Sequence, residues 1–196
     1  MKASNLACIA LFACAAFCAS SASAGDGAVA LQSADVSCPT ISGRYVDCGN
    51  GTVTDNLTGL TWTKNASCWG QTFFTWDRAS IEVLNLADGF CGLSDKSSPG
   101  EWRLPTKKEW ETMVAAAKAI GSCDPTLTND AGTNCYGEGP TSFTGVAGGE
   151  FGFYWSATTD SANVANAFLV AMISGNMSSF VKTGGAVRVW AVRGGQ

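Results

Sequence analysis

One ten-residue segment constrains the fold more than any other part of the chain: WRLPTKKEWE, residues 102–111. Pro105 favours an extended conformation at the preceding residue, Leu104, so a helix is expected to begin only after this point. Thr106 and Glu109 have the T-x-x-E spacing of a capping box, in which each side chain accepts a hydrogen bond from a backbone N–H that the helix leaves free. The segment therefore predicts an extended stretch that runs into a capped helix just after Thr106.

The first 24 residues have the features of a secretory signal peptide. Lys2 precedes an apolar run at 6–19, and the small residues at 22–24 match a cleavage site. The run is short for a transmembrane helix. The alternative is a lipoprotein processing site at 11–14, although Phe12 is bulky for such a site. We therefore expect an exported protein that is secreted, periplasmic or on the cell surface, with no transmembrane span.

Cysteine usage is informative in an exported chain, because disulfides form in oxidising compartments. Of the nine cysteines, Cys8, Cys14 and Cys18 lie in the signal peptide. The remaining six allow 15 pairings. Proximity along the chain favours three local bridges, Cys38–Cys48, Cys68–Cys91 and Cys123–Cys135. A metal site is the weaker interpretation, because the chain has no C-x-x-C pair and no histidine.

The lack of histidine also excludes several classes of active site. Ser-His-Asp and Cys-His arrangements need an imidazole base. Loss of Lys2 with the signal peptide takes the formal net charge from −4 to −5. Nucleic acid is therefore an unfavourable partner, because its phosphates repel an acidic protein. We expect no catalysis and no cofactor.

Periodicity and turn residues predict strands, then helices, then strands again. Gly49-Asn50-Gly51 is a strong hairpin signal between two strand-like segments. Apolar residues recur every three or four positions after Thr75 and after Thr106, which predicts two helices. The expected strands are 44–47, 52–55, 60–63, 153–158, 167–173, 177–182 and 187–193, and the expected helices are 75–86 and 107–120. Segment 122–150 is expected to be a long loop stapled by cysteines.

Several motif strings occur in an order typical of one family of bacterial domains. They are CGNGTVTD at 48–55, TGLTW at 58–62, GFCGLSD at 89–95, GEWRLPT at 100–106, YWSAT at 154–158 and VRGG at 192–195. The sequence resembles the Lcl C-terminal domain family over about residues 43–195. The expected organisation is a signal peptide at 1–24, an N-terminal leader at 25–42 and this domain at 43–195.

The resemblance implies a C-type-lectin-like α+β fold with a mixed or antiparallel β core, two helices and long disulfide-stapled loops. The best-known relatives lie at the tip of a collagen-like adhesin and bind sulfated glycosaminoglycans. This chain departs from them, because it has no collagen stalk and is acidic. The fold is also akin to the formylglycine-generating enzyme, but that chemistry needs two cysteines near the C-terminus, and the last cysteine here is Cys135.

Candidate ligand-binding residues come from three places. Trp69 lies beside Cys68 in a Gly-flanked loop and is the tryptophan expected to be most exposed. The basic cluster at the start of the second helix could bind an anion, since a helix N-terminus attracts negative charge; the alternative is a solvated helix start with the arginine paired to a carboxylate. The third place is the loop of residues 159–166. The candidates are Trp69, Arg103, Lys107, Lys108, Asp160 and Asn163, whereas Trp62, Trp76, Trp102, Trp155 and Trp190 are expected in the core.

Calcium is the metal that the aspartates could bind, because it prefers oxygen ligands. The EF-hand spacing is absent, however. Val189-Trp190-Ala191 also lacks the ligands of the Trp-Asn-Asp triplet that calcium-dependent C-type lectins use. No metal site is predicted, although a structural calcium is left open around the aspartates Asp47, Asp55, Asp77, Asp124, Asp130 and Asp160.

Together these features predict an exported, non-catalytic recognition or adhesion module. It would bind a glycan or a protein at the cell exterior through the loops 123–150 and 159–166, since loops on a rigid scaffold commonly carry binding sites. The alternative is a structural subunit of an extracellular or cell-surface assembly, in which strands pair with neighbouring subunits. A homo-oligomer is compatible with both. A weaker third hypothesis is an enzyme relative that uses Cys123 or Cys135.

Overall fold

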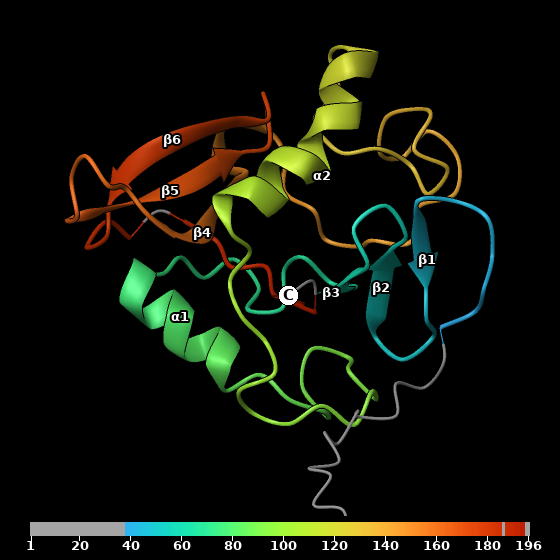
Figure 1. Ribbon diagram of the computed structural model, residues 1–196, viewed down its shortest axis with the longest axis horizontal. Helices are drawn as coiled ribbons and strands as arrows, with labels where there is room; N and C mark the ends of the chain where they lie inside the picture. Colours follow the sequence, from blue (N-terminus) through green and yellow to red (C-terminus); the bar gives the residue numbers. More distant parts are fainter. Residues whose placement is uncertain (1–37, 186, 195–196) are drawn as a thin grey trace, which may run out of the picture. The chain divides into compact units, whose positions relative to one another are not determined.

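The computed structural model describes residues 38–185 and 187–194 (Figure 1). The predicted signal peptide at 1–24 and residues 25–37 of the predicted leader lie outside the described residues. The described residues form two α-helices, one short 3-10 helix at Gly149–Phe151 and two antiparallel sheets, so the domain is of the α+β class. The finer prediction, a C-type-lectin-like fold, remains a prediction.

The first sheet joins the two ends of the domain. Its strands lie in the order β1 (Tyr45–Asp47), β2 (Thr52–Asp55), β3 (Leu60–Thr63) and β7 (Val192–Arg193), and all neighbours are antiparallel. The turn between β1 and β2 contains Gly49 and Gly51, and both have positive φ. Glycine adopts this conformation without a steric cost, which explains why this sequence turns here.

The second sheet is a three-stranded meander. Its strands are β4 (Phe153–Thr159), β5 (Asn166–Ala171) and β6 (Asn176–Val181), in that order, so β6 is an edge strand (Figure 1). The predicted strands in this region are confirmed, with shifts of one or two residues at their ends.

The predicted last strand, 187–193, is wrong in its length, because only Val192 and Arg193 belong to β7. The segment passes from one sheet to the other. Arg188 makes a single bridge to Tyr154 of β4, whereas Val192 pairs with Trp62 of β3. A segment divided between two sheets cannot maintain one continuous ladder, even though it is largely buried.

Both predicted helices are confirmed as α1 (Trp76–Leu84) and α2 (Lys107–Ile120). The predicted capping box is present at the start of α2. Thr106 Oγ1 accepts a hydrogen bond from the Glu109 N–H at 3.2 Å, and Glu109 Oε2 accepts one from the Thr106 N–H at 2.7 Å. Gly121 follows the last residue of α2, as predicted, whereas α1 ends two residues before the predicted Leu86.

Tryptophans form the centre of two buried clusters. In the first, the Trp190 ring lies 5.4 Å from Trp62 and 5.9 Å from Trp110, between the first sheet and α2. The second lies between α1 and the other face of the second sheet and contains Trp102 and Trp155. Of the five tryptophans predicted in the core, four are fully buried. Trp76 is half-buried: it packs against the second cluster, and Lys182 Nζ lies 4.3 Å from its ring centroid.

All six cysteines of the described region form the three predicted local disulfides, Cys38–Cys48, Cys68–Cys91 and Cys123–Cys135. Each bridge joins residues that are close in the chain, so each disulfide closes one local loop. Within residues 38–185 and 187–194, no helix combines the length and the apolar character needed to cross a membrane.

Candidate functional site

The loop between β4 and β5, residues 160–165, is held in shape by its own polar groups. The Asp160 N–H donates to Asn166 O at 3.0 Å, and the Asn166 N–H donates to Asn163 O at 2.8 Å. Asp160 Oδ1 accepts from the Ala162 N–H at 2.9 Å, and Asn163 Oδ1 accepts from the Ala165 N–H at 3.2 Å. Asp and Asn favour turns because they make such local bonds. The loop therefore presents its carboxylate and amide groups in a defined arrangement.

A hydrogen-bond chain connects this loop to β6. Ser179 Oγ donates to Asp160 Oδ2 at 2.5 Å and accepts from Asn166 Nδ2 at 3.0 Å. The Ser179 hydroxyl, then the Ala162 N–H, and also the positive charge of Lys107 hold the pKa of Asp160 below its ordinary value. Asp160 is therefore ionised at neutral pH, and its carboxylate can accept further hydrogen bonds because it has about four acceptor positions.

Lys107 brings the start of α2 to the same surface. Its backbone N–H donates to Thr158 Oγ1 at 2.9 Å, so β4 holds the beginning of the helix. Its Nζ lies 4.1 Å from the centroid of the Phe168 ring, in cation–π geometry, and 3.9 Å from Glu111 Oε1. We define the β4–β5 polar surface as Lys107, Asp160, Asn163, Asn166, Phe168 and Ser179.

Three of the six predicted ligand-binding residues, Lys107, Asp160 and Asn163, thus belong to one surface. Arg103 makes different contacts. Its guanidinium donates to Glu109 through two hydrogen bonds of 2.8 and 2.6 Å and to Gly194 O at 3.0 Å. The structure thus contains the arginine–carboxylate pair that was the alternative prediction at this helix start.

Lys108 is exposed and lies along a different groove, of about 460 Å³. The groove runs beside α2 and is lined also by Arg44, Leu57, Glu111, Thr112, Ala115 and Ala116. The Arg44 guanidinium already binds Asp55, with Nε–Oδ1 at 3.3 Å and Nη2–Oδ2 at 3.2 Å. The positive charge at this groove is therefore mainly that of Lys108.

Trp69 is half-buried, and its hydrogen bond and ring contacts in the described part of the chain are with residues other than the five remaining candidates. Its Nε1 donates to Glu82 Oε2 on α1 at 3.1 Å. Its ring packs against Phe74 and Phe90, with centroid distances of 6.3 and 6.0 Å. These contacts hold the indole beside the Cys68–Cys91 disulfide.

The other predicted binding loop, 123–150, contributes to the interior. Leu127 and Phe143 are buried in the first core cluster. Asp130 O accepts hydrogen bonds from the Arg44 and Tyr45 N–H groups at 2.6 and 3.1 Å, so the loop covers the start of β1. Much of this segment therefore supports the scaffold.

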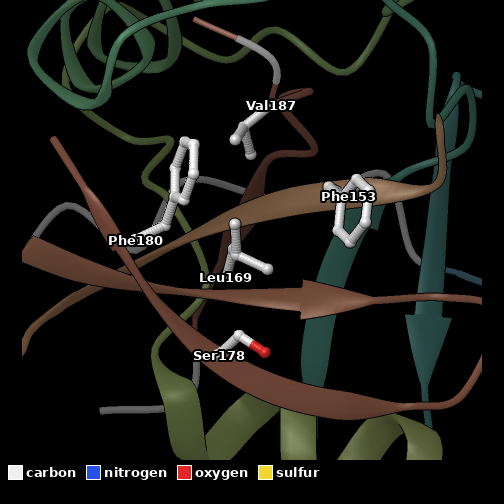
Figure 2. Close-up of a pocket in the computed structure, with 5 residues that line it drawn as sticks. All are labelled: Phe153, Leu169, Ser178, Phe180 and Val187. Atoms are coloured by element: carbon white, nitrogen blue, oxygen red, sulfur yellow. The ribbon is translucent and has the colours of Figure 1, made fainter. Parts of the chain in front are cut away.

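An apolar pocket of about 240 Å³ lies on the face of the second sheet opposite α2 (Figure 2). Its lining side chains come from all three strands and from the crossing segment: Phe153, Leu169, Ser178, Phe180 and Val187. Figure 2 shows the Phe153 and Phe180 rings on opposite sides of Leu169, with Ser178 on the outermost strand. A pocket with one hydroxyl can accept an apolar group but offers little to orient a polar ligand.

Sequence reasoning did not identify Asn166, Phe168 and Ser179 as site residues, nor the apolar pocket. The alternation of side chains along β6 could have indicated which other residues share the face of Ser179. Its partner in β5 is Phe168, as the register shows. That pairing requires knowing which strands are neighbours. Likewise, the pocket depends on Val187, which is close to Leu169 only after the chain folds.

In residues 38–185 and 187–194, no group of three or more His, Cys, Asp or Glu side chains is placed to hold a metal ion. Asp55 is paired with Arg44, and Asp47 is bonded to Lys64. The side chains of the β4–β5 polar surface offer hydrogen bonding and charge interaction.

The model of the Lcl C-terminal domain family matches residues 51–193. This range contains all the residues of the β4–β5 polar surface and of the apolar pocket. No curated protein matches the chain.

Proposed function

The chain belongs to the Lcl C-terminal domain family, and from this premise we propose that it is a non-catalytic recognition module that binds a glycan through the β4–β5 polar surface. We place it at the cell exterior, as a secreted, periplasmic or surface protein, because three disulfides are typical of oxidising compartments. We also propose that its α+β scaffold is C-type-lectin-like, as the family resemblance implies.

The observation that carries this proposal is the chain of hydrogen bonds from Asp160 through Ser179 to Asn166. It holds an ionised carboxylate and an amide at the surface in fixed positions. Carboxylate and amide groups together accept and donate hydrogen bonds, as the paired hydroxyl groups of a sugar require. A pre-ordered surface of this kind binds with a smaller entropy cost than mobile side chains would.

The charge of this surface favours a neutral glycan over a sulfated one. Asp160 is negative, and Lys107 is partly compensated by Glu111 at 3.9 Å and by the Phe168 ring. The chain as a whole is also acidic, with a formal net charge of −4. A sulfate group would therefore meet repulsion here. This chain would thus differ in ligand from the glycosaminoglycan-binding relatives.

A glycan array tests the proposal with the exported protein and two variants. Asp160→Asn removes the charge at the surface, and we expect it to weaken binding about 10- to 100-fold, the range for a lost hydrogen bond to a charged group. Asp77→Asn, an exposed change of the same kind on α1, is the matched control and should bind as the unmodified protein does. Arrays with calcium and with EDTA should agree.

A blank array, or an Asp160→Asn variant that binds normally, would contradict the glycan proposal. Binding to a protein ligand that Asp160→Asn weakens would retain the surface and change the ligand class. Binding that is lost in EDTA would instead require a calcium site.

A second candidate function is that of a structural subunit in an assembly at the cell exterior. The observation that favours it is the edge strand β6, which pairs only with β5 in the described part of the chain. An open strand edge can pair with a neighbouring subunit. Assembly that persists without any soluble ligand would support this role.

A further inference from the structure

We propose that the protein forms a two-fold dimer through antiparallel pairing of β6 with β6 of a second copy, centred on Ser179. The first evidence is the position and the exposure of β6. It is the outer strand of the second sheet (Figure 1), and four of its six residues are exposed. This dimer is a property separate from glycan binding and does not depend on it.

Other sheet edges of the described chain are covered. The start of β1 is bonded to Asp130 O, and Val192 of β7 exchanges backbone hydrogen bonds of 3.0 Å with Arg103. Within the described residues, the backbone contact at the outer edge of β6 is at its end, where the Gly184 N–H donates to Val181 O at 2.9 Å. The sequence of β6, NMSSFV, has no proline and no charge, and its pairing with β5 is regular from Asn176 to Val181. Natural edge strands that must remain unpaired commonly carry a proline, a charged side chain or a β-bulge, and β6 has none of these.

The hydrogen-bond pattern identifies which backbone groups of β6 are not directed at β5. The Lys182 N–H donates to Ala165 O at 2.9 Å. Because bonds in an antiparallel ladder recur at every second residue, the backbone groups of Asn176, Ser178 and Phe180 point to β5. Those of Met177 and Ser179, and the N–H of Val181, point outward. They are the donors and acceptors that a further strand would use.

The side chains of β6 match a second copy in this register. A two-fold axis at Ser179 places Met177 opposite Val181 of the second copy on one face of the sheet. Val181 is 42 % exposed and Met177 is half-buried, so the pairing would bury apolar surface that now contacts water. Cross-strand apolar pairs stabilise a sheet, and this register brings no two charges opposite each other.

On the other face, the same axis places Ser178 opposite Phe180 of the second copy. Ser178 forms the outer side of the apolar pocket, next to Leu169 (Figure 2). Because each Phe180 ring lies 5.9 Å from Trp155 in its own copy, the two pockets would lie side by side across the joined sheets. One register thus pairs the outward backbone groups of Ser179 with those of the second copy, directs the Val181 N–H to Met177 O of that copy, and packs Met177 against Val181, which favours a second copy over an unrelated apolar ligand.

Cross-linking tests the register directly in the exported protein. Ser179→Cys puts one thiol of each copy at the two-fold axis, where the Cα atoms of an antiparallel pair lie within disulfide range. We expect rapid formation of a covalent dimer. Leu57→Cys, which places a thiol on an exposed turn of the other sheet, is the matched control and should form dimers much more slowly.

Light scattering and sedimentation over roughly 10 µM to 1 mM give the non-covalent measure. We expect a concentration-dependent dimer that Val181→Lys abolishes and that Leu57→Lys leaves intact, with circular dichroism showing that both variants are folded. A monomer throughout this range would overturn the proposal. So would a dimer that Val181→Lys does not affect, or a Ser179→Cys protein that cross-links no faster than Leu57→Cys.

An extended peptide that binds β6 of a persistent monomer would also overturn it and would identify the edge as a site for other proteins. The outcome for the glycan proposal is read separately, from Asp160→Asn on the array.

Discussion

Arg103 and Glu109 are joined by two hydrogen bonds, Nη1 to Oε2 at 2.8 Å and Nη2 to Oε1 at 2.6 Å. The same carboxylate accepts the Thr106 N–H and so completes the capping box of α2. Arg103 in turn pairs through its backbone with Val192 of β7. One glutamate therefore connects the beginning of a helix to the strand that closes the first sheet.

Glu109→Gln should destabilise the protein by about 1–2 kcal/mol at neutral pH, the range for losing a helix cap and a charged hydrogen bond. Burial alone would raise the pKa of Glu109, but the hydrogen bonds from Arg103 and Thr106 outweigh it and lower the pKa. A lowered pKa in the folded state adds stability above the unfolded pKa, and this is lost as the pH falls through the folded value.

The stability difference between the unmodified protein and Glu109→Gln should therefore shrink below about pH 4.3, the ordinary pKa of a glutamate. Urea unfolding at a series of pH values measures it. Glu111→Gln, an exposed neighbour on α2, should show little change at any pH. A constant difference between pH 7 and pH 3 would contradict this role of the Glu109 charge.

Gly51→Ala should destabilise the β1–β2 turn far more than Gly49→Ala does. Both glycines have positive φ, with values of 83° and 73°, so both changes carry a backbone cost of about 1–2 kcal/mol. A Cβ at position 51 would in addition collide with the backbone of Gly92, whereas one at position 49 would meet open space. Thermal unfolding of the two variants checks this, and equal losses would show that the contact with Gly92 adjusts easily.

Trp190→Ala should cost about 3–5 kcal/mol, the usual range for truncating a buried aromatic side chain. The Trp190 side chain is fully buried, and its Nε1 donates to Thr63 O at 2.8 Å. Trp69→Ala should cost less, because Trp69 is only half-buried at the rim of the second cluster. Chemical denaturation gives both values, and a larger loss for Trp69→Ala would reverse our ranking of the two clusters.

Replacing Cys123 and Cys135 together by serine should reduce the free energy of unfolding by about 3 kcal/mol, as expected for opening a loop of this size. The two cysteines are separated by 12 positions, and Cys123 is buried. Asp160 and Ser179 lie on another part of the chain, so glycan binding should be retained in any variant that still folds. Peptide mapping without reduction should recover the three local cross-links in the unmodified protein.

Local features of the chain were sufficient to predict much of this structure. The capping box of Thr106 and Glu109 depends on four consecutive residues, and the turn at Gly49-Asn50-Gly51 on three. The local disulfides join cysteines that are already close in the chain. For the same reason the two helices and most strands were predicted within one or two residues. All of these depend on interactions over a short distance along the chain.

These short-range interactions account for the helix start, the turns, the local disulfides and the α+β order of elements. The tertiary structure was needed to show that 187–193 divides between two sheets and that the charge of Lys107 lies near Asp160. It also decided that β6 lies at an edge beside an apolar pocket. The reason is physical: these features join residues far apart in sequence, and their distances depend on how the two sheets and α2 pack.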